Sequence, residues 1–180
     1  EPLTRSGWED RTIWMGHAAI TNENEHLYTE TLARGGVGQA AVEGDPFNAF
    51  IDDWSFTALD HNFSKALVTA SGNDFSYQLH LERTAPFVLQ GIAGYSLKSH
   101  QGQASYYYSQ PFFRIDGELK IHKRSIHVVG QGWMDREWST SALAADQIGW
   151  DWFALQFADG SDMMIYHLRR RDGTSDPFSA

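Results

Sequence analysis

The sequence contains no cysteine. This excludes disulfide bridges, thiolate zinc sites, iron–sulfur clusters and a cysteine nucleophile. No apolar run approaches the roughly 18–20 residues that a membrane-spanning helix needs, so we expect no transmembrane segment. Positive charge is also scarce, because 14 Lys and Arg stand against 23 Asp and Glu, for a net charge of −9. Phosphate backbones bind positive surfaces, so we expect no nucleic-acid partner.

The common enzyme motifs are missing as well. The sequence has no G-x-S-x-G nucleophile elbow, no Walker A loop, no G-x-G-x-x-G and no H-E-x-x-H. Its eight histidines are scattered singly, without the spacing of metal ligands. We therefore expect neither a metal site nor a bound cofactor.

The residues that are present favour β-structure. The chain has 180 residues, of which 42% are hydrophobic and 14% aromatic, enough for one domain with its own core. Apolar and polar residues alternate without a break from Phe75 to Glu82, which is typical of a strand with one solvated face. No window of 12 or more residues has a helical stripe, and Thr140–Gln147 is expected to form at most one short helical turn.

Turn signals separate the strand-like runs. Asp116-Gly117 and Asp159-Gly160 each lie between two such runs and predict hairpins, because Asp-Gly tolerates the positive φ of a type I′ turn. Asp172-Gly173 predicts a further turn. We expect strands near residues 13–20, 26–34, 54–59, 65–70, 75–82, 87–90, 104–109, 112–115, 118–121, 127–134, 150–157 and 162–170.

About a dozen short strands predict an all-β, antiparallel fold of about 10–12 strands with little helix, either a β-barrel or a strongly curled β-sandwich. Residues 150–157 and 162–170 are apolar on both faces, so both faces need cover. A barrel interior covers one face. A second domain, a partner subunit or a long loop would cover the other.

Three aromatic clusters carry the functional signal: Tyr106–Tyr108, Gly132–Ser139 and Gly149–Phe153. One interpretation is a large aromatic core with acids at strand ends. The other is a cavity lined by flat apolar faces, in which a desolvated carboxyl has a raised pKa and serves as a proton donor. The candidate acids are Asp52, Asp53, Asp135, Glu137 and Asp151.

These clusters also carry a family resemblance. The motifs are DDWS at 52–55, SYYYS at 105–109, GWMDREW at 132–138 and GWDWFALQ at 149–156. Through them the sequence resembles the CrtC/AttH-like family, which includes hydroxyneurosporene synthase (carotenoid 1,2-hydratase) and proteins labelled predicted secreted hydrolase. The resemblance runs from about Asp10 to Ala180. It departs at Arg11–Met15, where a family pattern Arg-Thr-Glu-Trp-Trp is matched only loosely and its Glu is replaced.

The resemblance implies a fold and a domain organisation. Family members are similar to two lipocalin-like β-barrels in tandem, in a chain roughly twice this length. Residues 1–180 are thus expected to form a single lipocalin-like β-domain, the N-terminal half of a longer two-domain protein. A second lipocalin-like domain or a partner subunit is an expected partner. Because many family members look exported, the expected location is periplasmic or secreted.

The resemblance also implies a chemistry, the cofactor-free addition of water to an isolated C=C bond. By motif, Asp135 is the expected acid, and Glu137 or Asp53 would hold the water. The residues expected to flank the cation are Tyr107, Trp133, Trp138 and Trp152. Three further residues, Trp54, Tyr108 and Trp150, are expected to bind the apolar, terpenoid-like or polyene-like ligand. The alternative for Asp135–Glu137 is an ion-pair network that fixes a strand end.

Three function classes stay open. The first is a hydro-lyase similar to carotenoid 1,2-hydratase, or an isomerase or pericyclase-like enzyme on the same kind of ligand. The second is a non-catalytic carrier of an apolar small molecule. The third is a glycan-binding or hydrolytic secreted domain, for which two carboxyls about 5–10 Å apart across an open groove would be the signature.

Overall fold

The computed structural model describes residues 7–140 and 143–179. Its described part is all-β with a single three-residue 3-10 helix, η1 (Gly7–Glu9), which confirms the predicted fold class. The strands are β1 (Ile13–Thr21), β2 (His26–Arg34), β3 (Ala40–Glu43), β4 (Asn48–Ile51), β5 (Trp54–Ala58), β6 (Lys65–Ser71), β7 (Phe75–Arg83), β8 (Val88–Leu89), β9 (Tyr95–Leu97), β10 (Ala104–Ile121), β11 (Arg124–Trp138), β12 (Gln147–Gln156) and β13 (Asp162–Arg170). Within this part, no helix has the length and hydropathy to cross a membrane.

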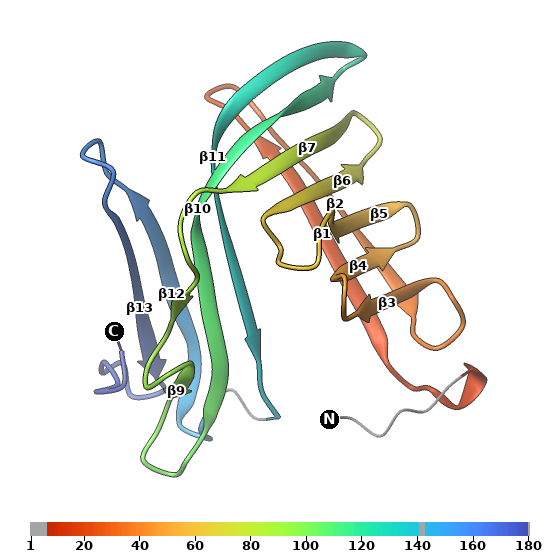
Figure 1. The fold of residues 1–180 in the computed structure, drawn as a ribbon. Coiled ribbons are helices and arrows are strands. Elements are labelled where there is room, and N and C mark those ends of the chain that lie inside the picture. Colours follow the sequence, from red (N-terminus) through yellow and green to blue (C-terminus); the bar gives the residue numbers. More distant parts are fainter. Residues whose placement is uncertain (1–6, 141–142, 180) are drawn as a thin grey trace. The chain divides into compact units, whose positions relative to one another are not determined.

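The strands form three sheets, and every register pairing is antiparallel. β1 and β2 form one hairpin sheet, and β12 and β13 form another. The third sheet runs in the order β11-β10-β7-β6-β5-β4-β3, with the short β8 and β9 also paired to β10 (Figure 1). The order follows the chain from β3 to β7, as expected of a meander joined by tight turns.

By its internal contacts the chain divides into two compact units. Unit 1 comprises Glu1–Thr84 and Phe113–Gly132, and unit 2 comprises Ala85–Phe112 and Trp133–Ala180. The long strands β10 and β11 therefore each contribute residues to both units.

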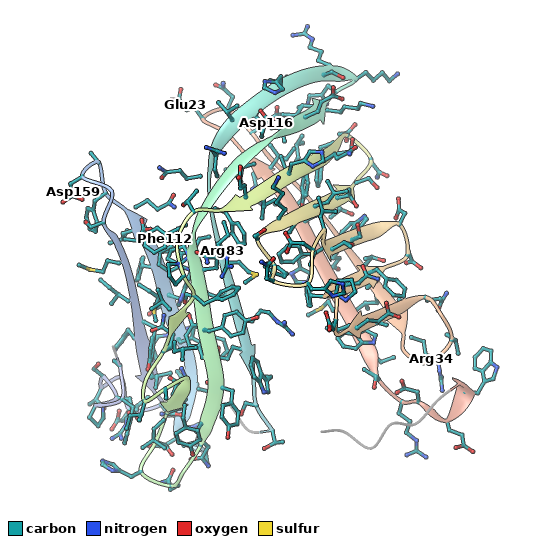
Figure 2. All side chains as sticks on the ribbon, viewed as in Figure 1. Glu23, Arg34, Arg83, Phe112, Asp116 and Asp159 are labelled. Atoms are coloured by element: carbon teal, nitrogen blue, oxygen red, sulfur yellow. The ribbon has the colours of Figure 1, made fainter. Side chains whose placement is uncertain are left out.

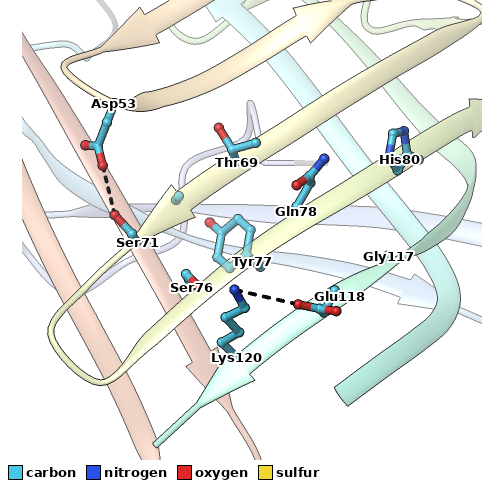
Figure 3. Close-up of a pocket in the computed structure, with 11 residues that line it drawn as sticks. Asp53, Thr69, Ser71, Ser76, Tyr77, Gln78, His80, Gly117, Glu118 and Lys120 are labelled. Carbon is cyan, nitrogen blue, oxygen red and sulfur yellow. Dashed lines mark hydrogen bonds and ion pairs between the residues drawn. The ribbon is translucent and has the colours of Figure 1, made fainter. Parts of the chain in front are cut away.

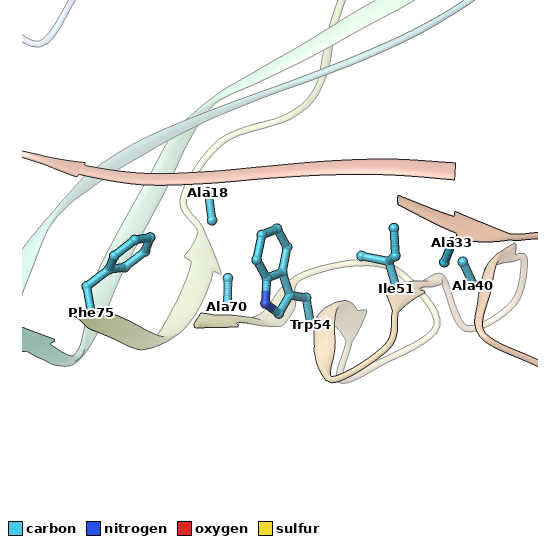
Figure 4. Close-up of a cluster of buried hydrophobic side chains, with 7 residues drawn as sticks. All are labelled: Ala18, Ala33, Ala40, Ile51, Trp54, Ala70 and Phe75. Atoms are coloured by element: carbon cyan, nitrogen blue, oxygen red, sulfur yellow. The ribbon is translucent and has the colours of Figure 1, made fainter. Parts of the chain in front are cut away.

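Unit 1 is a two-layer structure with an apolar core. The β1–β2 hairpin lies across the meander β3–β7 (Figure 1), and alternate residues of each strand point into the space between. The buried cluster there consists of Ala18, Ala33, Ala40, Ile51, Trp54, Ala70 and Phe75 (Figure 4). Small alanines let the hairpin approach closely, and the indole of Trp54 fills the middle. Its Nε1–H donates to the Ser71 carbonyl at 3.0 Å, so its polar atom is satisfied.

Unit 2 contains β8, β9, the first half of β10, the end of β11 and the β12–β13 hairpin, whose turn carries Asp159 (Figure 2). Its interior is polar in part. Asp176 is buried and accepts hydrogen bonds from Arg170 Nε at 2.9 Å, Gln147 Nε2 at 3.0 Å and the Phe178 backbone N–H at 2.9 Å. These bonds fix the segment after β13 against the start of β12.

The predicted hairpin at Asp116-Gly117 is wrong, because both residues lie inside the continuous strand β10 (Figure 2). They pair with His80 and Leu79 of β7. A Cβ at Gly117 would lie 2.3 Å from the Gln78 carbonyl oxygen, so the glycine is needed for close strand approach. Pro111 is tolerated in β10 because it lies between two pairing partners of that strand. β10 pairs with β8 as far as Ser109 and with β7 from Phe113 onward.

Other turns divide into confirmed and missed ones. The Asp159-Gly160 hairpin joins β12 to β13 as predicted, with Gly160 at φ 84°. The turn between β10 and β11 falls instead at His122-Lys123, with φ of 47° and 71° and no glycine to mark it. The short strands β3, β4 and β9 were not predicted. No helix forms in the described part of Thr140–Gln147, since Gln147 already begins β12.

Candidate functional site

One face of β10 and β11 in unit 2 gathers polar and aromatic side chains of the predicted site. Alternation along a strand directs every second residue to the same face. Ser105, Tyr107 and Ser109 thus share a face of β10, and Trp133, Asp135 and Glu137 share a face of β11. Two hydrogen bonds join the sets: Ser109 Oγ donates to Asp135 Oδ1 at 2.5 Å, and Ser105 Oγ donates to Glu137 Oε1 at 2.5 Å.

Tyr107 lies at the centre of this face. Its side chain is buried, and its hydroxyl accepts a hydrogen bond from Trp152 Nε1 at 3.2 Å. Burial, with a smaller contribution from the negative charge of Asp135, outweighs the opposing bonds from Trp152 and Ser109 and raises the pKa of Tyr107 to about 12. The phenol therefore keeps its proton at neutral pH, next to the carboxyl that we expect to be the acid.

Asp135 is half-buried and held by a polar support. Ser109, which donates to it, is fully buried and in turn accepts from Gln90 Nε2 at 2.9 Å. The chain Gln90–Ser109–Asp135 fixes the carboxyl in one orientation, as a second layer of hydrogen bonds does in enzyme sites.

Trp133 and Trp152 complete the aromatic part. Their rings meet edge to face, with centroids 6.3 Å apart. The Trp133 Nε1–H is buried and has no hydrogen-bond partner. A buried donor without an acceptor is costly and uncommon in folded proteins, which makes this atom a candidate contact for a ligand oxygen or a water.

Lys98 is the residue that sequence reasoning missed. Its ammonium is buried, lies 4.3 Å from the ring centroid of Tyr166 and 5.2 Å from that of Tyr107, and pairs with Glu137 Oε1 at 3.3 Å. No pattern marks it in the sequence. In β9 and the residue after it, the apolar Tyr95 and Leu97 are exposed, while the polar Ser96 and Lys98 are buried. The usual assumption that the apolar side of a strand is the buried one therefore predicts the wrong side here.

A small cavity of about 50 Å³ opens beside this pair. It is lined by Lys98, Tyr107, Glu137, Leu143, Trp150, Trp152, Tyr166 and Leu168. Its walls are mostly aromatic and aliphatic, with one ammonium, one carboxylate and one phenol. The volume suits one or two groups the size of a water molecule, and is too small for an elongated ligand.

Tyr108 and Trp138, which the sequence placed in the same site, lie on the opposite face of β10 and β11. There they form a separate cluster with Arg136, whose guanidinium carbon lies 5.9 Å from the Tyr108 centroid and 6.0 Å from that of Trp138. Tyr106 stacks on Trp138 at 5.9 Å. The structure thus separates these two predicted ligand-binding residues from Tyr107, Asp135 and Glu137.

Asp53 and Trp54 belong to unit 1. Trp54 is a core residue, while Asp53 accepts a hydrogen bond from Ser71 Oγ at 3.2 Å at the rim of a polar groove of about 460 Å³ (Figure 3). The groove is lined by the polar residues Thr69, Ser76, Gln78, His80, Glu118 and Lys120, among others.

Chemically, the unit 2 face offers a fixed carboxyl, a protonated phenol, two indoles, and a buried ammonium paired with a partly exposed carboxylate. In the described ranges no three His, Asp or Glu side chains are grouped so that they could hold a metal ion.

The comparisons with known proteins agree on family and fold. The crystal structure of an AttH protein from Nitrosomonas europaea is 28% identical in sequence, with a TM-score of 0.84 over 91% of this chain and 51% of that one. Kievitone hydratase from Nectria haematococca shares the fold at 15% identity, with a TM-score of 0.64 over 90% of this chain and 54% of the hydratase.

The chain therefore spans about half the length of these two structures. No curated protein sequence matches it. The family description AttH-like matches all of residues 1–180. The sequence resemblance to the CrtC/AttH-like family is thus confirmed, and the chain belongs to the AttH-like family.

Proposed function

We propose that this protein binds an elongated apolar molecule of the terpenoid or polyene class through unit 2 and adds water to one of its C=C bonds by acid catalysis. The observation that carries the proposal is the fixed carboxyl of Asp135 beside the buried phenol of Tyr107 and the paired indoles of Trp133 and Trp152. The fold shared with a hydratase supports water addition as the reaction class.

In this mechanism the carboxyl of Asp135 gives its proton to one alkene carbon, and a C–H bond forms. The neighbouring carbon becomes a tertiary cation, which the ring faces of Trp133 and Trp152 stabilise. Tyr107 serves by its hydroxyl rather than its ring, because Lys98 already lies over that ring. The phenol donates to the Asp135 carboxylate after proton transfer and keeps it in place.

Water then forms the C–O bond, and its surplus proton passes to Glu137. Glu137 is partly exposed, so this proton exchanges with solvent and Asp135 is reprotonated. The net change is alkene plus water to tertiary alcohol, with no redox step. Because the cavity of about 50 Å³ admits only a small group, the hydrocarbon chain lies along the exposed faces of Trp150 and Trp152, which are 51% and 40% accessible.

The test incubates the full chain with an acyclic carotenoid in water enriched in oxygen-18 and analyses the products by mass spectrometry. We expect a tertiary alcohol that carries the label, and a rate at least about 100-fold lower for Asp135→Asn. Asp159→Asn, in the exposed β12–β13 turn, is the matched control and should leave the rate unchanged. Equal turnover by Asp135→Asn and wild type would remove Asp135 as the acid, and no labelled alcohol would remove the reaction.

A second candidate, a carrier without catalysis, is favoured by a different observation. Unit 1 has an open groove of about 370 Å³ between the β1–β2 hairpin and the meander, with a mainly apolar lining that includes Trp14, Val42, Phe50 and Trp54. Micromolar quenching of tryptophan fluorescence by a fatty acid, lost in Val42→Arg but kept in Asp135→Asn, would support it. Quenching that survives Val42→Arg would eliminate this groove as the site.

A further inference from the structure

Lys98 has an unusual environment for a lysine. Its side chain is only 8% exposed, although lysines are seldom fully buried. An ammonium has three N–H donors, and in the described ranges the only acceptor for them is Glu137 Oε1, at 3.3 Å. The two tyrosine rings stabilise the charge but accept no conventional hydrogen bond. The remaining donors of the ammonium have no oxygen partner among the described residues.

The backbone of Lys98 is also held firmly in position. The Lys98 backbone N–H donates to the Gln103 carbonyl at 2.7 Å, and the Lys98 carbonyl accepts from Gln147 Nε2 at 2.7 Å. Gln147 is itself buried and bound to Asp176. The ring of Tyr166 packs against the ammonium at 4.3 Å. The anchored backbone, the ring of Tyr166 and the carboxylate of Glu137 together restrict where the ammonium can lie.

Lys98 and Glu137 both line the small cavity of unit 2. A donor and an acceptor 3.3 Å apart complement a single O–H group, which accepts from the ammonium and donates to the carboxylate. The pair is neutral overall. A ligand carboxylate would bring an uncompensated negative charge, and a hydrocarbon would leave the donors unpaired.

We propose that Lys98, together with Glu137, binds one neutral hydroxyl group in this cavity. In terms of the proposed function, on which this inference rests, that group is the attacking water before addition and the tertiary hydroxyl of the product afterwards. The site therefore prefers an alcohol to the matching alkene, ether or acid.

The test measures binding rather than turnover, by calorimetry and tryptophan fluorescence with the full chain. The probes are a ten-carbon alkene (dihydromyrcene), its tertiary alcohol hydration product (dihydromyrcenol) and the methyl ether of that alcohol. The ether accepts a hydrogen bond but cannot donate one to Glu137. We expect the alcohol to bind about tenfold more tightly than the ether, the cost of one unpaired buried polar group, and more tightly still than the alkene.

In Lys98→Met the preference for alcohol over alkene should fall to within about twofold, while Lys65→Met, on the exposed side of β6, should keep it. If Lys98→Met fails to fold, the double variant Lys98→Met/Glu137→Leu removes the pair as a whole and should likewise lose the preference. Rescue by Lys98→Arg, which restores a donor, separates positioning from a structural role.

The outcomes distinguish this inference from the proposed function. If alcohol, ether and alkene bind equally, or if Lys98→Met keeps the preference, the hydroxyl site is overturned while apolar binding stands. If none of the three binds, both the ligand class and this inference are overturned. If the alcohol preference holds but no hydration is found, the hydroxyl site stands and the reaction fails.

Discussion

The two units of the molecule bury different kinds of side chain. In unit 1 the buried residues are apolar, from Ala18 and Ala33 of the hairpin to Trp54 and Phe75 of the meander. In unit 2 they include every buried polar side chain of the described residues: Ser96, Lys98, Ser99, Ser105, Ser109, Gln110, Gln147 and Asp176. Both units are built from antiparallel strands, but the interior of unit 1 is apolar and that of unit 2 is partly polar.

This difference indicates which unit contributes more to the stability of the fold. Apolar burial contributes directly to the free energy of unfolding, at roughly 25 cal/mol per Å². Buried polar groups contribute little net stability even when they are hydrogen-bonded, and buried charges can cost more than they return. The polar interior of unit 2 therefore adds little to folding stability and is consistent with the proposed function, whereas unit 1 provides the apolar framework.

Removing an apolar core residue of unit 1 should have the largest effect on stability. Trp54→Ala deletes the central side chain of the core and is expected to lower the free energy of unfolding by about 4 kcal/mol. Denaturant unfolding measures it. Trp8→Ala is the control, because Trp8 is 79% exposed, and it should lower the free energy of unfolding by less than about 1 kcal/mol. Similar losses for both would show that the unit 1 core does not provide the main stability.

The next effect concerns the most buried carboxylate of unit 2. Burial alone would raise the pKa of Asp176, but hydrogen bonds from Phe178, Gln147 and Arg170 outweigh it and lower the pKa below the ordinary 3.8. Its stabilisation is therefore fully present above that value and is lost as pH falls through the folded-state pKa. Asp176→Ala should cost about 2 kcal/mol at neutral pH, the value of hydrogen bonds to a charged group.

The check is denaturant unfolding of wild type and Asp176→Ala from neutral pH down to acid pH. The difference between them should shrink once the pH falls below the ordinary pKa of Asp176. A difference that stays constant down to the lowest pH would mean that the ionised carboxylate contributes nothing.

The smallest effect is on the titration of Tyr107. Its pKa of about 12 comes first from burial and then from the charge of Asp135, so Asp135→Asn should lower the pKa without returning it to 10. Since the folded-state pKa is raised, the corresponding stability is present below pH 10 and is lost between about 10 and 12. Ultraviolet titration of the phenol measures this. Asp151→Asn, whose carboxylate pairs with Arg169 and His167 instead, should leave the Tyr107 pKa unchanged.

Strand periodicity predicted most of the fold. β2 and β13 were predicted with the observed bounds, because their alternation and flanking turn residues are strong local signals. The Asp116-Gly117 error has a tertiary cause: Gly117 is required where β10 approaches Gln78 of β7, and no local pattern distinguishes that from a turn. The family resemblance was confirmed. The expected two-domain organisation and exported location stay predictions.

The candidate site was predictable only in part. The motif around Asp135 and the Trp150–Trp152 pair drew attention to unit 2 because aromatics beside acids are uncommon. Lys98 could not be found in the same way, because its role depends on Tyr107 and Tyr166 from two other strands. The sequence alone could not show that Trp138 lies on the opposite face of β11 from Asp135 and Glu137. Its neighbours Arg136 and Glu137 are both charged, so no alternation of apolar and polar residues marks the two faces there.

We propose that the ion pair of the buried Lys98 with the partly exposed Glu137 serves ligand recognition and not stability. Its most direct test is the free energy of unfolding of Lys98→Met/Glu137→Leu, in which apolar side chains of similar size replace both charges. We expect a value within about 1 kcal/mol of wild type, or higher, because removing both charges also removes the cost of keeping the Lys98 ammonium out of water. A loss of about 3 kcal/mol or more would contradict it and make the pair a structural element of unit 2.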